Sequence, residues 1–210
     1  MYLKEKSTEE LAQELLDRTD LLTSEGVIIS KALYTLIERI VPIMCVDMVP
    51  VRRNRSGELE AMAIVRNTGK LAGKLCSVGG RINRRPESHP PESIEDALRR
   101  HARTDLGCEI KLLVDSERPV ILGQFAPREK EENWIHSKVF LPESTKHAIS
   151  SYFPVELIGE VHLGETLHGG QEARDIQWFT LADMPAPEKF IFGVDLRFKA
   201  CLEVAERLIL

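Results

Sequence analysis

The stretch from Ser77 to Cys108, SVGGRINRRPESHPPESIEDALRRHARTDLGC, gathers residue types that can handle phosphate. It opens with the glycine pair Gly79-Gly80, continues as a basic, proline-rich loop, and ends in a helical segment that stops at Gly107. Glycines let a backbone approach a ligand closely, and the fork of an arginine matches phosphate oxygens. A solvated basic loop would have the same composition, so both interpretations stay open. The arginines that bracket the pair are Arg66, Arg81, Arg84 and Arg85.

Asp105 occupies an unusual position in the helical segment. On a wheel of about 100° per residue it falls within the apolar stripe of Ile94 and Leu98. Burying a bare carboxylate is costly, so an inward-facing aspartate must be paired or must bind a cation. Two interpretations follow, namely an internal salt bridge to an arginine such as Arg100, or a metal ligand. The spacing does not choose between them.

The composition is that of a globular protein with one domain of good size. The 210 residues are 43% hydrophobic and 29% charged, which is enough for a full core. A net charge of −5 argues against general nucleic-acid binding, and no apolar run approaches the ~20 residues of a membrane span. The four cysteines form no C-x-x-C pair, and the amino terminus lacks the apolar core of a signal peptide. We therefore expect free thiols and a cytoplasmic location.

Two helical segments near the amino terminus predict a helical extension over residues 1–40. One begins near Ser7–Glu10 with leucines at helical spacing, and the other covers Ser30–Ile40. Such an extension would suit a packing or dimerisation element, so a homodimer is the expectation for an assembly. Residues 41–210 are expected to form a single domain.

Beyond residue 40 the pattern changes to short strands around one central helix. A hairpin turn is expected at Asn54–Gly57, and a helix over Glu92–Leu106 with Gly107 as its left-handed stop. A second helix is predicted over Val194–Leu210. Strands on both sides of a central helix, with another helix at the end, predict an α/β or α+β sandwich. The strand candidates are VPIMCVDMVPVRR, ELEAMAIVRN, KLCSVGG, VILGQFA, WIHSKVFL, LIGEVHLG and DIQWFTL.

The region around the glycine pair resembles a Nudix box, whose pattern is G-x5-E-x7-R-E-U-x-E-E-x-G-U, with U an aliphatic residue. Gly80 matches the opening glycine and Gly107 the closing one. Glu92 matches the first glutamate, and seven residues separate it from Arg100, as the pattern requires. The resemblance covers Val41 to about Leu181 and implies an α/β/α sandwich with a mixed sheet.

The departures from this pattern concern the loop and the acids. Eleven residues separate Gly80 from Glu92, where the family has five, so the loop carries a six-residue insertion. The three glutamates that follow the arginine in the family are replaced by His101, Thr104 and Asp105. In the family those glutamates hold several divalent ions around a diphosphate. The single acid that is left here argues against a multi-metal cluster.

The GDP-mannose mannosyl hydrolase branch of the Nudix family is similar in lacking most of these glutamates. Its glycines are followed by an arginine and an aliphatic residue, as in Gly79-Gly80-Arg81-Ile82, and another arginine lies fifteen positions upstream, as Arg66 does. The resemblance implies a metal site formed by the backbone carbonyl of Gly79 with Asp105 and Glu172. It also implies a substrate-binding role for Asp47.

The chain departs from this branch at the catalytic base. The branch has a histidine directly after its last metal ligand, where this chain has Ala173, and its active-site tyrosine position holds Ser137. His168 is a candidate substitute base, although a solvated loop histidine would look the same. Glu172 is a glutamine in the branch, so here it is expected to be either a metal ligand or the general base.

Together these features predict a magnesium-dependent Nudix-type hydrolase of a nucleoside diphosphate derivative, namely a GDP-mannose-like nucleotide sugar. The cofactor would be Mg²⁺ or Mn²⁺, held by few carboxylates and by the substrate phosphates. Arg66, Arg81 and Arg100 would stabilise the remaining charge, the alternative for Arg100 being a salt bridge to Glu92 or Asp105. The expected partner is a small-molecule nucleotide, and neither a nucleic acid nor a membrane. The alternative function is a catalytically inactive Nudix-like nucleotide-binding or regulatory module.

Overall fold

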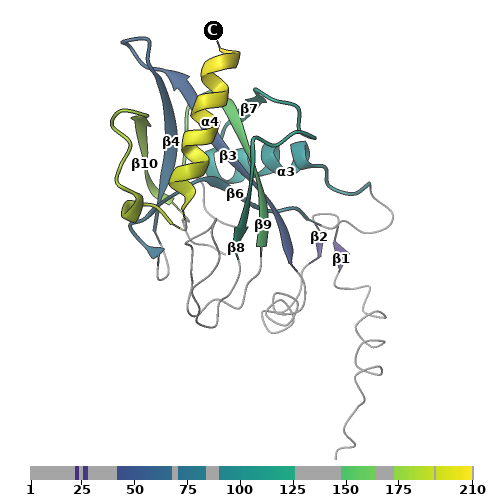
Figure 1. The fold of residues 1–210 in the computed structure, drawn as a ribbon. Coiled ribbons are helices and arrows are strands. Elements are labelled where there is room, and N and C mark those ends of the chain that lie inside the picture. The colour runs from purple at the N-terminus through teal and green to yellow at the C-terminus, as the bar shows by residue number, and fades with distance from the viewer. Residues whose placement is uncertain are drawn as a thin grey trace, which may run out of the picture.

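The computed structural model describes residues 22–23, 26–27, 42–67, 71–83, 90–125, 148–163, 173–191 and 193–209. In these residues a mixed sheet lies between two helices, α3 (Ile94–His101) and α4 (Val194–Leu208) (Figure 1). Neither of the two is long and apolar enough to cross a membrane. The predicted N-terminal helices and the strand candidate WIHSKVFL lie outside the described residues.

The sheet has eight strands, and its main path runs β10-β4-β3-β9-β7. β5 pairs with β4, β6 with β3, and β8 with β9. Only the β3–β9 pairing is parallel among these ladders, so the described sheet is mixed, as predicted. A separate two-stranded ladder joins β1 (Leu22–Thr23) and β2 (Gly26–Val27). The strands of the main sheet are β3 (Ile43–Arg53), β4 (Leu59–Arg66), β5 (Leu75–Cys76), β6 (Val78–Arg81), β7 (Glu109–Leu112), β8 (Ile121–Phe125), β9 (Ala148–Ile158) and β10 (Ala173–Thr180).

The predicted hairpin is confirmed, since β3 and β4 pair antiparallel around the turn at Asn54–Gly57. The side chain of Asn54 stabilises the turn by accepting backbone N–H bonds from Ser56 at 2.9 Å and from Glu58 at 3.0 Å. Gly57 takes a φ of 82°, a conformation that favours glycine. The residue types that predicted the turn are therefore the ones that form it.

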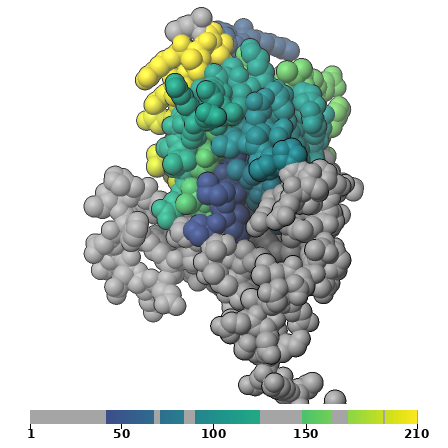
Figure 2. All heavy atoms as spheres, turned by 90° about the vertical axis from the view of Figure 1, so that its right-hand side faces the viewer, coloured from purple at the N-terminus to yellow at the C-terminus, as the bar shows by residue number. Residues whose placement is uncertain are grey.

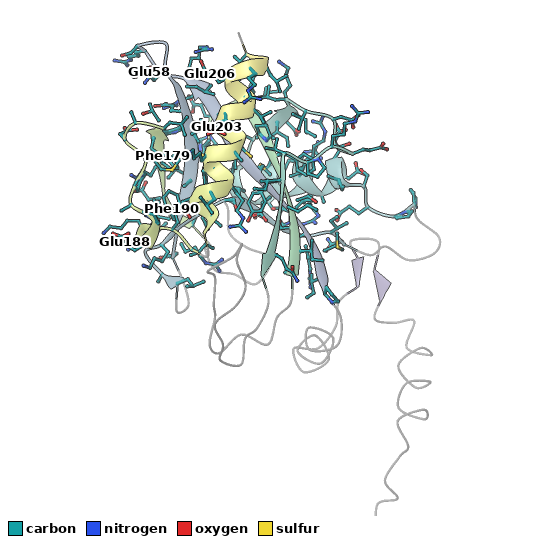
Figure 3. All side chains as sticks on the ribbon, in the orientation of Figure 1. Glu58, Phe179, Glu188, Phe190, Glu203 and Glu206 are labelled. Carbon is teal, nitrogen blue, oxygen red and sulfur yellow. The ribbon has the colours of Figure 1, made fainter. Side chains whose placement is uncertain are left out.

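Alternating side chains of the sheet pack into two separate apolar cores. Val46 and Met48 of β3 pack with Leu98 of α3 in one core, whereas Val49 packs with Phe198 of α4 in the other. Because successive strand side chains point to opposite faces, the two cores lie on the two sides of the sheet. Figure 3 shows Phe179 and Phe190 beside α4, and their rings meet edge to face with centroids 5.6 Å apart. The layering is that of an α/β/α sandwich.

The central helix begins two residues later than predicted, and its last turn is π-helical. Ser93 is its N-cap, because the Ser93 hydroxyl accepts the backbone N–H of Asp96 at 3.0 Å. The last five residues form a π-helical turn, η3 (Ala102–Leu106), which Gly107 ends in a left-handed conformation with φ 63°. The wheel of about 100° per residue does not apply to a π-helical turn, so the orientation of Asp105 must be taken from the structure.

The predicted strand LIGEVHLG is wrong. The strand in this region is β9, which ends at Ile158, and residues 159–163 form no strand. Gly159 follows with a φ of 100°, and the backbone N–H of His162 donates to the carbonyl of Leu106 at 2.7 Å. The segment therefore binds the end of the central helix and not the sheet. The stretch AISSYFPVELI, which forms β9, was missing from the strand candidates.

Candidate functional site

The glycine pair lies on β6, which runs antiparallel to β3. A Cβ on Gly79 would lie 2.1 Å from the carbonyl oxygen of Val46 and 2.7 Å from the Cα of Asp47, and its φ is 151°. A Cβ on Gly80 would instead lie 2.9 Å from Cε1 of the His101 ring. Each glycine is therefore needed for a different reason, because Gly79 lets β6 approach β3 and Gly80 makes room for His101.

An ion pair between Glu92 and Arg100 lies beside the end of β6. The Arg100 guanidinium donates from Nε to Oε1 at 2.7 Å and from Nη2 to Oε2 at 3.0 Å, and the Glu92 side chain is 1% exposed. Arg100 Nη2 also donates to the carbonyl of Arg81 at 2.9 Å, and Glu92 Oε2 accepts the backbone N–H of Asn83 at 2.5 Å. The pair therefore ties the end of β6 to the helix.

Asp105 is half-buried and its partners are side chains of the same helix. Oδ2 lies 3.0 Å from Nδ1 of His101, and Oδ1 lies 3.0 Å from the hydroxyl of Thr104. Of the two salt-bridge partners considered for Arg100, Glu92 is the one that the structure shows. The three residues that replace the family's glutamates thus contact one another.

Two of the donors predicted for a cation, the Asp105 carboxylate and the Gly79 carbonyl, lie within the described residues. The Asp105 carboxylate and the Gly79 carbonyl are oxygen donors, which Mg²⁺ prefers, and a carboxylate with two partners can still accept more bonds. Within the described ranges, no three His, Cys, Asp or Glu side chains gather so as to hold a metal ion. Glu172, the third predicted ligand, and His168 lie outside the described residues, as does Ser137.

A second cluster of polar side chains, centred on Asp47, lies on the α4 side of the sheet. Its carboxylate accepts hydrogen bonds from the hydroxyls of Ser77, at 2.7 Å, and of Ser150. Tyr152 lies beside it, and burial raises the pKa of this phenol, with the Asp47 charge raising it further. Burial also raises the pKa of the Cys201 thiol on α4 to about 12, and Asp47 adds to this shift. These neighbours place Asp47 between the sheet and α4.

The side chains of Arg66 and Arg81, two of the arginines predicted for the site, lie on opposite faces of the sheet. Alternation along β6 puts Arg81 on the same face as Gly79, whereas Arg66 shares a face with Ile64, whose side chain packs in the α3 core. Arg66 is the last residue of β4 and pairs with Ala173 of β10. The start of β3, which pairs with the end of β6, reaches the surface beside the region of α3 (Figure 2). Arg81 is exposed and follows the glycine pair at the end of β6.

Sequence reasoning missed Ser77 and Ser150 as polar partners of Asp47, and His101 as the partner of Asp105. Ser77 lies two residues before Gly79, so strand alternation alone could have placed it on the same face. Ser150 could not be found, because it lies on β9, which was not predicted. His101 precedes Asp105 by four residues, a helical spacing that brings side chains together.

Comparison with known proteins bears on the fold. A family model described as Domain of unknown function (DUF4916) matches residues 24–191. No curated protein sequence matches the chain significantly. Among similar solved structures is a possible asymmetric diadenosine tetraphosphate hydrolase from Jonesia denitrificans. It is 24% identical, with a TM-score of 0.59 over 80% of this chain and 98% of that one.

Two further structures are similar at lower identity. A MutT Nudix hydrolase from Burkholderia pseudomallei is 17% identical, with a TM-score of 0.50 over 78% of this chain and 97% of the other. The Nudix domain of NrtR from Shewanella oneidensis, complexed with ADP ribose, is 16% identical. Its TM-score is 0.50 over 86% of this chain and 99% of that one. At these identities the similarity is evidence of a shared fold and of nothing finer.

Proposed function

Because the chain belongs to the family described as Domain of unknown function (DUF4916) and has the Nudix fold, we propose that it hydrolyses a nucleoside diphosphate derivative. The substrate is a nucleotide sugar similar to GDP-mannose. The observation that carries the proposal is the glycine pair of β6, which lies between two polar groups. Asp47 and its serines lie on the α4 side, and Asp105 with His101 lies on the α3 side.

In the proposed complex the diphosphate lies along the glycine pair. Gly79 and Gly80 present backbone without side chains, so phosphate oxygens can approach it closely. Arg81, at the edge of the pair, is proposed to supply positive charge that stabilises the leaving diphosphate. Arg66, at the end of β4, lies on the opposite face of the sheet and is proposed to act from the side of Asp105. Arg100 acts through its ion pair with Glu92 and its bond to the Arg81 carbonyl, which hold the end of β6, and so has a positioning role.

One cation, Mg²⁺ or Mn²⁺, is proposed to be held by the Gly79 carbonyl, Asp105 and Glu172. When bound, such an ion neutralises phosphate charge and polarises a phosphoryl oxygen. Glu172 is the alternative general base for the attacking water, and His168 is the other candidate for that proton. Since Asp105 is the one acid that remains of the box pattern after Arg100, a single-cation site suits this donor set better than a cluster.

Asp47 is proposed to bind the nucleoside part of the substrate. Its two oxygens already accept the hydroxyls of Ser77 and Ser150, which fix the orientation of the carboxylate. Asp47 is also half-buried and not fully enclosed. A similar fold binds ADP ribose in the NrtR Nudix domain, which supports a nucleoside diphosphate as the ligand class.

The test is hydrolysis of GDP-mannose and of ADP-ribose in oxygen-18 water, with Mg²⁺, followed by mass spectrometry of the products. Label in the sugar means cleavage at carbon, and label in a phosphate means cleavage at phosphorus. Asp105→Asn and Glu172→Gln should each lose most of the turnover. Asp96→Asn, which changes an exposed acid on the same helix, should not. Full magnesium-dependent activity in both site variants would refute the assignment.

One observation favours a second candidate, a binding module without catalysis. The Asp105 carboxylate contacts His101 Nδ1 and the Thr104 hydroxyl, each at 3.0 Å, so it has polar partners without a cation. A thermal-shift screen of nucleotide sugars with Mg²⁺ and with a chelator separates the two functions. Stabilisation that survives the chelator, without turnover of the same ligand, identifies the module.

A further inference from the structure

The His101 ring fills the space between Asp105 and the glycine pair. Nδ1 lies 3.0 Å from Asp105 Oδ2. The ring also covers Gly80, where an added Cβ would lie 2.9 Å from Cε1 and 3.1 Å from Nε2. Its side chain is 12% exposed. The ring is therefore packed in place, in contact with both the carboxylate and the backbone of β6.

The second oxygen of Asp105 also has a partner. Oδ1 lies 3.0 Å from the Thr104 hydroxyl, and the Asp105 side chain is 18% exposed. Both oxygens therefore contact polar groups of their own helical segment, and neither contact needs a bound ion.

The acceptor next to the ring is engaged as well. The carbonyl of Arg81, at the end of β6, accepts Arg100 Nη2 at 2.9 Å. Arg100 Nη1 lies 3.4 Å from His101 Nε2, so the guanidinium lies close to the ring. A guanidinium can only donate, so it offers a cation no ligand atom.

These contacts do not fit the cation that was predicted for this region. Mg²⁺ needs several oxygen ligands at once and holds them at about 2.0–2.1 Å in an octahedron. A ring in contact with Asp105 and with Gly80 leaves no place for an ion at that distance from both the carboxylate and the glycine backbone. Over the part of the chain that the structure describes, no three His, Cys, Asp or Glu side chains gather to hold one.

We infer that His101 closes this space to divalent cations, so that the chain binds its nucleotide without one. The inference rests on the second of the proposed functions, the nucleotide-binding module, and adds that its ligand is the metal-free nucleotide. The charge of the diphosphate is then met by the exposed guanidinium of Arg81, beside the glycine pair. His101 stands where the Nudix pattern has a glutamate, so one residue both lacks the carboxylate and fills its place.

The first test is Mn²⁺ binding by the full-length chain, measured from the electron paramagnetic resonance signal of the free ion. The wild type should leave this signal unchanged. His101→Glu, which removes the ring and adds a carboxylate, should gain Mn²⁺ binding, and adding Asp105→Asn to that variant should abolish the gain. Thr104→Glu is the matched control, because it adds a carboxylate but leaves the ring, and it should gain no binding.

Circular dichroism melting shows which variants are folded. Should His101→Glu fail to fold, His101→Ala takes its place, since it removes the ring alone and should also gain binding. Mn²⁺ binding by the wild type, equal gains in Thr104→Glu and His101→Glu, or no gain in a folded variant without the ring would each overturn the inference.

The second test is calorimetric titration of the wild type with ADP-ribose and with GDP-mannose, in Mg²⁺ and in a chelator. The affinity should be the same in both conditions, because no cation takes part. A loss of affinity in the chelator would overturn the inference and favour the single-cation hydrolase. Absence of binding by both nucleotides in both conditions would refute the proposed function and the metal-free ligand with it, while the Mn²⁺ measurement would still decide whether His101 closes the site.

Discussion

The role of Arg100 depends on the burial of Glu92. By residue type alone, an arginine beside a basic loop that follows a glycine pair is a candidate ligand for a diphosphate. Its guanidinium is instead bound on two atoms by a carboxylate that is 1% exposed, and it also donates to the carbonyl of Arg81. A carboxylate so buried needs its partner, because an unpaired buried charge is strongly destabilising. The main effect of Arg100 is therefore to hold the end of β6 against α3.

Replacing Arg100 by alanine should lower the free energy of unfolding by about 3 kcal/mol, since it leaves the buried Glu92 charge unpaired. The measurement is chemical denaturation followed by circular dichroism. The matched control is Arg103→Ala in the π-helical turn, which breaks an exposed ion pair with Glu109 of β7 and should leave stability almost unchanged. Equal effects of the two substitutions would contradict the importance of the buried pair.

At the level of elements, the glycine pair decides how closely β6 approaches β3. The register opposes Gly79 to Asp47 and Gly80 to Val46. At Gly79 the obstacle to any side chain is the backbone of β3, which cannot move away as a flexible side chain could. The pairing that forms the site therefore depends on the absence of one Cβ atom.

Gly79→Ala should separate β6 from β3 and abolish both the cooperative fold and ligand binding. Gly57→Ala is the matched control, because Gly57 also has a positive φ but has no atom within 4 Å of an added Cβ. The control should cost only the conformational strain, about 1–2 kcal/mol. Thermal melting compares them, and a similar small cost at Gly79 would mean that β6 need not lie so close to β3.

The packing of α4 on the sheet buries two groups that resist ionisation. Burial raises the pKa of Tyr152 on β9 and brings that of Cys201 on α4 to about 12, with the Asp47 charge acting in the same direction. In the unfolded chain a thiol ionises near pH 8.5 and a phenol near pH 10. Above about pH 9 the unfolded state therefore loses protons that the native state keeps, so stability must fall as pH rises.

We expect the melting temperature to be steady below about pH 8.5 and to fall progressively up to about pH 11. Tyr152→Phe removes one of the two groups and should make this fall shallower, whatever its effect on stability at neutral pH. Differential scanning calorimetry across this range measures the slope. An unchanged slope in the variant would show that Tyr152 is not protected from ionisation in the native state.

Over the whole molecule, the four cysteines are buried in the sandwich and none is in a disulfide. Their burial agrees with the free thiols expected from the sequence. Burial raises the pKa of Cys108 as well as that of Cys201, which keeps both in the less reactive thiol form. Thiol reactivity should therefore report on opening of the whole fold.

Ellman's reagent at about pH 8 should react with no thiol of the native protein within minutes, because all four are buried and burial raises the pKa of Cys108 and Cys201. In guanidinium chloride it should react with all four. Labelling rates at intermediate denaturant should follow the unfolding transition seen by circular dichroism. Fast release of one equivalent of thionitrobenzoate by the native protein would identify a cysteine that local opening exposes.

The sequence by itself determined the features that depend on local spacing. The hairpin at Asn54–Gly57, the central helix with its stop at Gly107, and the glycine pair all follow from conformations that a few neighbouring residues prefer. The mixed α/β sandwich followed from the order of these elements. These local conformational preferences are kept in the folded protein, because its tertiary packing favours the same conformations.

The tertiary structure alone decided which side chains meet. Asp47 joins Ser77 and Ser150, which are 30 and 103 positions away in the sequence, because strand pairing brings them to one face. The choice of His101 over Arg100 as the partner of Asp105 depends on the burial of Glu92 and on the π-helical turn. Such contacts are set by sheet register and by competition for buried partners, which local patterns do not encode.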